Sequence, residues 1–202
     1  MKILFLTNKD AENYNQIPNF LSLYGDEITI FFDKINAEFV KDKKIDFIIS
    51  DRYEHLIKED VINLLQNKII NLHPSLLPWS RGYYPNFWSI FDDTPKGVSI
   101  HKIDKGIDTG DILVQKEIFF EDEDTLKTTY HKVRVAIVNL LFDNWIKIKN
   151  FELKGFKKND VKGTHHYKKD FDEISHLIKK NGWNTKILEL KEIKKIYIKL
   201  QK

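Results

Sequence analysis

The sequence is informative first through what it lacks. Its 202 residues include no cysteine, which excludes disulfides, thiolate metal sites and a cysteine nucleophile and gives no sign of an oxidising compartment. Its eight glycines do not form the fingerprint of a dinucleotide-binding loop. The longest apolar runs, such as residues 28–32, are far too short to span a bilayer, and no secretory signal is apparent at the N-terminus. We therefore expect a cytoplasmic protein that binds no metal.

The net charge of +3 hides an uneven distribution of charge. Residues 150–202 carry 14 Lys against 7 Asp and Glu, which gives +7, whereas residues 1–149 carry 19 Lys and Arg against 23 acidic residues, which gives −4. A basic segment attracts phosphate-bearing substrates or nucleic acid. A solvated lysine-rich face is the simpler interpretation of the same pattern.

The hydrophobic pattern predicts an α/β fold. Short apolar runs alternate with amphipathic stretches, and the expected strands cover residues 2–7, 27–32, 46–50, 69–72, 97–103 and 112–118. This alternation favours a mostly parallel sheet with flanking helices. Residues 124–149 place apolar side chains at steps of three and four, which predicts a long helix with Asp124 and Thr125 as capping candidates.

The pattern weakens beyond residue 150, where glycines separate lysine-rich segments. A short helix is expected near residues 171–180. We therefore predict a main domain over residues 1–150 and a short basic C-terminal appendage over residues 151–202.

Two polar side chains lie at the end of the fourth expected strand. Asn71 and His73 are two residues apart, so on an extended backbone they point to the same side. Their position after a buried run places them near the carboxyl edge of the sheet, where open α/β sheets bind ligands. Alone, this pair is more typical of a structural histidine. A second segment makes the combination specific, because the loop between Gly106 and Gly110 carries Asp108.

Together these segments resemble the folate-dependent formyltransferases, a family that includes glycinamide ribonucleotide, methionyl-tRNA and sugar-nucleotide N-formyltransferases. The resemblance covers about residues 46–150 and rests on Asn71-Leu-His-Pro-Ser-Leu-Leu-Pro78, Arg81-Gly82 and Gly106-Ile-Asp-Thr-Gly-Asp-Ile112. It implies a Rossmann-like formyltransferase fold, with N10-formyltetrahydrofolate as cosubstrate. It also implies that the family's catalytic residues are Asn71, His73 and Asp108 in this chain.

The chemistry of formyl transfer suits these three residue types. An uncharged amine attacks the formyl carbon and generates a tetrahedral oxyanion before the folate nitrogen leaves. An N–H donor from Asn71 or His73 stabilises that oxyanion, and one such donor lowers the barrier by about 3 kcal/mol. Asp108 can orient the imidazole or accept the proton of the amine. The sequence leaves open whether His73 or Asp108 is the base.

The resemblance also implies where the folate binds. Residues 50–57 line the pterin pocket in the family, and loop 104–107 closes its other side. The residues expected nearest the folate are Tyr53, His55, Leu56, Ile57, Asp104 and Ile107. The alternative interpretation is that residues 53–57 only begin a helix that packs on the sheet.

Three acceptor classes are compared through their sequence features. Glycinamide ribonucleotide enzymes have a glycine-rich phosphate loop after the first strand, but residues 7–14 contain no glycine here. Methionyl-tRNA enzymes add a C-terminal β-barrel, and only about 50 residues follow the main domain here. Residues 77–89 and 163–170 look most like the compact sugar N-formyltransferases. Those enzymes act on nucleotide-linked 3- or 4-amino deoxysugars, including dTDP-linked ones, for surface polysaccharides such as the O-antigen of lipopolysaccharide.

The acceptor site is therefore expected in the segment after His73. Trp79, Tyr83, Tyr84 and Trp88 offer stacking faces for a sugar or base, and Arg81 offers a fork for a phosphate. A small nucleotide sugar as acceptor argues against nucleic acid or membrane partners and leaves a homodimer open.

Three alternatives stay open. One is formylation of methionyl-tRNA or glycinamide ribonucleotide. A second is a non-catalytic binding protein of the same fold, with the basic tail contacting nucleic acid or a partner. A third is hydrolysis of the formyl-folate by water. His101 is expected to point into the core or to lie behind the catalytic residues.

Overall fold

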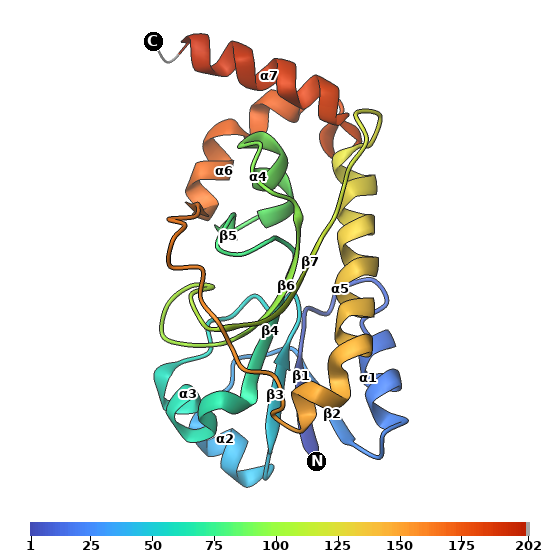
Figure 1. Cartoon of the computed structure of the whole chain (residues 1–202), viewed down its shortest axis with the longest axis vertical. Coiled ribbons are helices and arrows are strands. Elements are labelled where there is room, and N and C mark those ends of the chain that lie inside the picture. The colour runs from blue at the N-terminus through green and yellow to red at the C-terminus, as the bar shows by residue number, and fades with distance from the viewer. Residues whose placement is uncertain (201–202) are drawn as a thin grey trace. The chain divides into compact units, whose positions relative to one another are not determined.

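The computed structural model describes residues 1–200 and contains one six-stranded sheet (Figure 1). The strands are β1 (Lys2–Leu6), β2 (Glu27–Phe31), β3 (Phe47–Ser50), β4 (Ile69–His73), β6 (Gly97–Lys102) and β7 (Ile112–Glu117). Their order is β2-β1-β3-β4-β6-β7, and the pairs β1–β2, β1–β3 and β3–β4 are parallel. The predicted α/β class with a mostly parallel sheet is confirmed.

A second, two-stranded sheet joins segments that are far apart in the sequence. Its strands are β5 (Arg81–Gly82) and β8 (His165–His166), which pair in parallel. The tail is therefore built into the fold beside residues 81–82.

Seven α-helices occur in the described residues. They are α1 (Gln16–Ser22), α2 (Ala37–Asp42), α3 (Glu59–Leu65), α4 (Pro85–Phe91), α5 (Leu126–Lys149), α6 (Lys168–Ile174) and α7 (Ile187–Leu200). Three 3-10 turns accompany them, η1 (Gln66–Lys68), η2 (Ser175–Ile178) and η3 (Gly182–Asn184). None of these helices is both long enough and apolar enough to cross a membrane.

The helices match those predicted from the hydrophobic pattern of the sequence in part. The long helix α5 lies where its periodicity predicts it, and α6 with η2 takes the place of the short predicted helix. The sequence pattern did not predict α7. Its apolar side chains Leu190, Ile193 and Tyr197 lie at helical steps and pack on one cluster, but its several isoleucines have lower helix propensity and weaken the signal.

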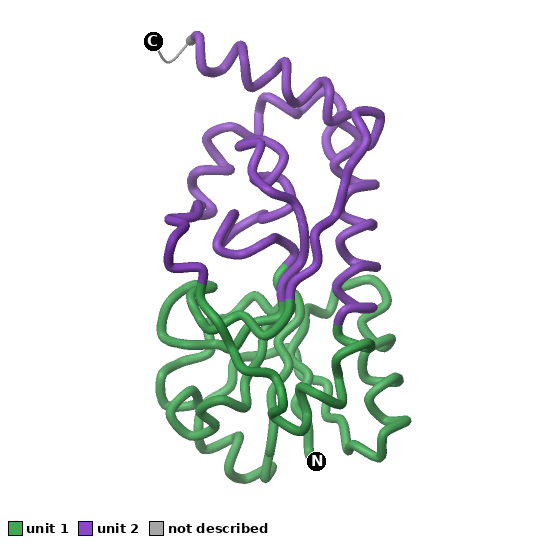
Figure 2. Tube along the Cα trace, viewed as in Figure 1, with its two compact units in different colours: residues 1–73, 100–114, 141–157 green, residues 74–99, 115–140, 158–202 purple. Residues whose placement is uncertain are grey.

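The chain divides into two compact units, coloured separately in Figure 2. Unit 1 comprises residues 1–73, 100–114 and 141–157, and unit 2 comprises residues 74–99, 115–140 and 158–202. Each unit collects three segments of the chain, so neither coincides with the predicted ranges 1–150 and 151–202. The last residue of β4, His73, ends the first segment of unit 1.

Unit 1 buries both faces of its strands. One face of β1 and β3 packs with α2 and α3 in an apolar cluster that includes Leu4, Ile48 and Val61. On the other face, the ring of Phe47 meets Trp145 of α5 edge-on at 5.9 Å between ring centroids. Figure 1 shows α2 and α3 on one side of these strands and α1 with the last turns of α5 on the other. Burial on both faces explains why these strands read as continuous apolar runs.

Unit 2 has a core of its own around α4. Phe87, Trp88 and Phe91 pack with Leu126 and with side chains of α6 and α7. The amide of Asn86 donates to Thr129 Oγ1 at 3.0 Å, which ties α4 to the start of α5.

A buried carboxylate connects the last turn of α5 to the start of β2. The side chain of Asp26 is inaccessible to solvent, and its Oδ1 lies 2.6 Å from Lys149 Nζ and 3.0 Å from the N-terminal ammonium. Burial acts to raise the pKa of Asp26, but the two cations hold the pKa below its ordinary value of 3.8. The folded pKa is therefore lower than the unfolded one. The resulting stabilisation is present above pH 3.8 and is lost as the pH falls through the folded pKa.

Replacing Lys149 with methionine should lower the free energy of unfolding by about 2 kcal/mol near neutral pH, because it leaves a buried carboxylate with one cation instead of two. Urea unfolding at pH 7 and pH 3 measures the effect, which should shrink at the lower pH as Asp26 becomes protonated. The exposed neighbour Lys147, replaced in the same way, is the matched control. An effect of equal size at both pH values would contradict this role for Asp26.

Candidate active site

The ends of two neighbouring strands and one loop supply four polar side chains of unit 1. Asn71 and His73 come from the carboxyl end of β4, and His101 comes from β6. Asp108 lies in the loop between β6 and β7 with a φ of 53°, a left-handed conformation that Asp adopts more readily than most residues. Gly110 lets this loop fold back, because a Cβ there would lie 1.8 Å from the carbonyl oxygen of Lys102.

The Asp108 carboxylate is the centre of this arrangement. Its Oδ1 atom lies 3.6 Å from His73 Nδ1, 3.4 Å from His101 Nε2 and 3.4 Å from Asn71 Nδ2. Both imidazoles are buried, and their rings meet edge-on at 6.0 Å between centroids. The structure thus brings together the three residues predicted to be catalytic.

His101 occupies the supporting position that the sequence predicts for it. Its Nδ1 lies 2.7 Å from the carbonyl oxygen of Lys102 and must donate a proton to it. In the neutral ring, Nε2 then accepts from the Asn71 amide, 3.2 Å away. This contact fixes the orientation of the Asn71 carboxamide, with its Nδ2 atom toward His101.

The loop that carries Asp108 is held by its own side chains. Asp104 Oδ1 accepts hydrogen bonds from the backbone of Gly106 at 3.1 Å and from Thr109 Oγ1 at 2.5 Å. Ile107 is exposed. Of the two predicted folate contacts in this loop, Asp104 therefore shapes the backbone, while Ile107 offers an apolar side chain to the outside.

The segment after β3 contains the other predicted folate contacts. Tyr53 and Ile57 pack on the apolar cluster of unit 1, while Leu56 is exposed and His55 meets the Tyr53 ring edge-on at 5.3 Å. The Tyr53 hydroxyl donates to the carbonyl oxygen of Asp33 at 2.6 Å, and burial raises the pKa of Tyr53 to about 12. Tyr53 and Ile57 thus have packing roles, and Leu56 and His55 have accessible surface.

One group of side chains could hold a metal ion by distance alone. The nearest ligand atoms of His73, His101 and Asp108 lie within 4.8 Å of one another. However, the Asn71 amide donates toward both His101 Nε2 and Asp108 Oδ1. An ion at this position would have to displace that amide, so the arrangement suits hydrogen-bond catalysis better.

The predicted acceptor segment belongs to unit 2 and is held by the tail. Thr164 is bonded on both sides: its backbone N–H donates to the Pro78 carbonyl at 3.2 Å, and its Oγ1 accepts from the Ser80 N–H at 2.7 Å. Arg81 N donates to the Thr164 carbonyl at 3.0 Å. The tail backbone comes so close that a Cβ on Gly82 would lie 2.3 Å from the carbonyl oxygen of His166.

We call residues 163–167 the strap. His166 of the strap connects it to α4. His166 Nε2 lies 2.7 Å from Asp92 Oδ2, and its ring stacks on Trp88 at 3.7 Å between centroids with an interplanar angle of 3°. The resemblance included residues 163–170 but gave no signal for the partners of His166. Trp88, predicted as a stacking face for the ligand, is instead buried against His166. Asp92 and His166 are 74 residues apart, and no local pattern connects them.

The predicted acceptor residues differ in their surroundings. Tyr83 and Tyr84 are partly exposed and meet at 4.3 Å between ring centroids. Burial and a hydrogen bond with Tyr83 raise the pKa of Tyr84 to about 12, so Tyr84 stays a neutral phenol at physiological pH. Trp79 and Arg81 are half-buried in the segment that the strap holds.

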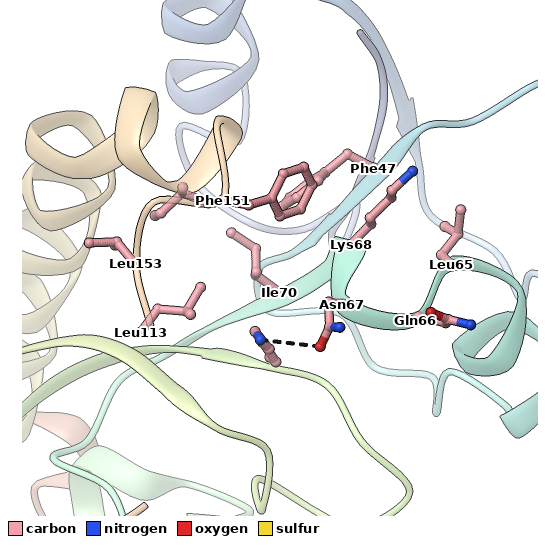
Figure 3. Close-up of a pocket in the computed structure, with 11 residues that line it drawn as sticks. Phe47, Leu65, Gln66, Asn67, Lys68, Ile70, Leu113, Phe151 and Leu153 are labelled. Atoms are coloured by element: carbon pink, nitrogen blue, oxygen red, sulfur yellow. Dashed lines mark hydrogen bonds between the residues drawn. The ribbon is translucent and has the colours of Figure 1, made fainter. Parts of the chain in front are cut away.

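Unit 1 contains a cavity of about 380 Å³ (Figure 3). Its walls come from the starts of β3 and β4, the end of α3 and the segment after α5, and include Phe47, Ile70, Lys102 and Phe151. Lys102 Nζ donates to Asn67 Oδ1 at 3.1 Å, and both residues line the cavity. None of the predicted site residues lines it.

Known proteins support the formyltransferase interpretation. Among curated proteins, the methionyl-tRNA formyltransferase of Finegoldia magna is 32% identical over 130 residues, covering 62% of this chain and 39% of that protein. The corresponding protein of Fusobacterium nucleatum is 32% identical over 153 residues, covering 73% and 49%. The chain thus spans about half or less of the length of these relatives.

Solved structures match a larger share of the chain. The formyltransferase PseJ from Anoxybacillus kamchatkensis, in complex with UDP-4,6-dideoxy-4-formamido-L-AltNAc and tetrahydrofolate, is 36% identical with a TM-score of 0.87, covering 94% of this chain and 97% of that one. A 4-N formyltransferase from Francisella tularensis shares the fold at 23% identity and a TM-score of 0.72, covering 86% and 79%.

The model of one family, formyl transferase, matches residues 3–144. This range includes Asn71, His73, His101 and Asp108. Since the match covers well over half of the sequence, the chain belongs to the formyl transferase family.

Proposed function

We propose that the protein transfers the formyl group of N10-formyltetrahydrofolate to the amine of a nucleotide-linked amino deoxysugar. The observation that carries this proposal is the convergence of Asn71, His73 and His101 on the Asp108 carboxylate, in a chain that matches PseJ over almost its full length. The sugar nucleotide in the PseJ complex is UDP-linked and carries its formamide at C4. We therefore favour a UDP-linked 4-amino-4,6-dideoxy sugar over the dTDP-linked ones.

The geometry supports a division of roles in the reaction. The acceptor amine attacks the formyl carbon, and N–H donors of Asn71 and His73 stabilise the oxyanion of the tetrahedral intermediate. Asp108 Oδ1, 3.4 Å from Asn71 Nδ2 and 3.6 Å from His73 Nδ1, keeps these groups oriented and accepts the proton that the amine loses, directly or through His73 or water. Collapse of the intermediate breaks the bond to N10, which takes up a proton as tetrahydrofolate leaves.

The acceptor segment favours a small nucleotide sugar over a macromolecule. Residues 158–200 form a strap and helices that pack around α4 and hold Arg81 in place. PseJ, whose complex contains a nucleotide sugar, matches 94% of this chain. Trp79, Arg81, Tyr83 and Tyr84 are thereby proposed to contact the sugar nucleotide.

Removing the central charge should abolish most activity. Asp108→Asn is expected to lower kcat by roughly 10²- to 10⁴-fold, and Asn71→Ala by roughly 10²- to 10³-fold, because each removes a group that acts in the transition state. Steady-state assays of tetrahydrofolate release, with both KM values little changed, measure this. Asp111→Asn, in the same loop with a more exposed carboxylate, is the control. A fully active Asp108→Asn variant would disprove the catalytic assignment.

The acceptor class can be tested by supplying one acceptor at a time. UDP- and dTDP-linked 3-amino and 4-amino dideoxysugars, glycinamide ribonucleotide and methionyl-tRNA are each incubated with N10-formyltetrahydrofolate. We expect the highest kcat/KM with a UDP-linked 4-amino sugar and little folate release without acceptor. Turnover only with a non-sugar acceptor would overturn the acceptor assignment and leave the catalytic residues intact. Formate release without any acceptor would indicate hydrolysis instead.

Chelation should not affect catalysis. Because the proposed chemistry uses only hydrogen-bond donors and a carboxylate, activity after dialysis against EDTA is expected to equal that of untreated enzyme. The measurement is initial rate before and after dialysis, with and without added Zn²⁺ or Mg²⁺. Loss of activity that a divalent ion restores would contradict this mechanism.

A further inference from the structure

Three aromatic rings from separate segments of unit 2 form one cluster beside the strap. Tyr84 immediately precedes α4, Phe171 lies in α6 and Trp183 lies in η3. The Tyr84 ring lies 4.3 Å from Phe171 and 5.4 Å from Trp183 between centroids. The planes of Phe171 and Trp183 are nearly parallel, at 7° and 5.9 Å. Tyr83 adds a fourth ring through its contact with Tyr84.

Hydrogen bonds hold the turn that presents Trp183. Gly182 has a φ of 55°, and its carbonyl accepts from Thr185 Oγ1 at 2.7 Å. Asn181 Nδ2 donates to both carboxylate oxygens of Glu189, at 3.0 and 2.9 Å. The indole is therefore presented by an ordered turn.

This ordered cluster leaves aromatic surface open to solvent. Phe171 is buried, but Trp183 is 45% exposed, Tyr83 38% and Tyr84 37%. Packing of the core requires only the buried side of these rings. Adjacent exposed aromatic faces on an ordered support are suited to a flat ligand, since aromatic rings gain energy from stacking in offset or tilted arrangements.

The chemistry of the cluster suits one part of a nucleotide sugar, the base. A nucleobase is flat and uncharged, and every base has a π-face that can stack on an aromatic side chain.

We propose that Trp183, with Tyr83 and Tyr84, forms the subsite that stacks on the base of the acceptor nucleotide. This inference rests on the proposed function, and it adds Trp183 to the acceptor residues expected from the sequence. Trp183 is a binding residue and takes no part in the chemistry at Asp108.

Steady-state kinetics of Trp183→Ala test the subsite. The KM for the UDP-linked amino sugar should rise roughly ten- to hundredfold, the loss expected for one stacked base. The KM for N10-formyltetrahydrofolate and the kcat should stay unchanged. Phe119→Ala is the matched control, because Phe119 is an aromatic residue of the same unit that is 83% exposed and outside the cluster. Its kinetics should equal those of the wild type.

Trp183→Phe keeps a ring and provides a second test if the alanine variant is unstable. Its KM should rise less than that of Trp183→Ala. In the wild type, UDP should change tryptophan fluorescence in a way that inorganic pyrophosphate does not, and this base-dependent change should be much smaller in Trp183→Phe. A full base-dependent change in that variant would overturn the subsite.

The outcomes separate this inference from the proposed function. Unchanged KM values in both variants of an enzyme that formylates the amino sugar would overturn the subsite alone. A wild-type protein that neither formylates an amino sugar nor responds to UDP would overturn both.

Discussion

The position of one carboxylate organises the candidate active site. Asp108 Oδ1 is within 3.6 Å of the two imidazoles and the carboxamide. Holding it there requires a left-handed residue, a glycine at 110 that lets the loop return to β6, and the bonds of Asp104 across the same loop. Because hydrogen bonds weaken steeply with distance and misalignment, a small displacement of the loop would uncouple the donors from the charge that orients them.

His101 shows how a strand of the sheet fixes the orientation of a neighbouring side chain in the site. Its hydrogen bond to the Lys102 carbonyl fixes the tautomer, and its other nitrogen then fixes the orientation of Asn71. An amide that could rotate would present an oxygen to the developing oxyanion half of the time, which would oppose catalysis. Strand β6 therefore contributes to the preorganisation of the amide although the family resemblance assigns it no catalytic residue.

The sequence predicted the sheet and the long helix, because buried strands and helical periodicity are local signals. The three central residues followed from the resemblance to the formyltransferases. The sequence also predicted the supporting position of His101. It did not predict α7 or the packing of the tail around the acceptor segment. The pairing of Arg81 with His165 and the stacking of Trp88 with His166 join residues more than 70 positions apart. Such contacts depend on tertiary packing, which periodicity and turn residues do not encode.

The residues around Asp108 and those of the predicted acceptor segment also differ in how they tolerate substitution. The residues around Asp108 are buried or nearly so, and each one contacts another, so a substitution there leaves a polar partner unsatisfied. The acceptor segment is held mainly through backbone hydrogen bonds of residues 78–83 with the strap. Backbone bonds do not depend on side-chain identity, so exposed positions such as Tyr83 can vary while the scaffold persists. The proposed function needs this arrangement: a fixed carboxylate for the transfer, and a strapped loop whose exposed side chains are proposed to select the amine.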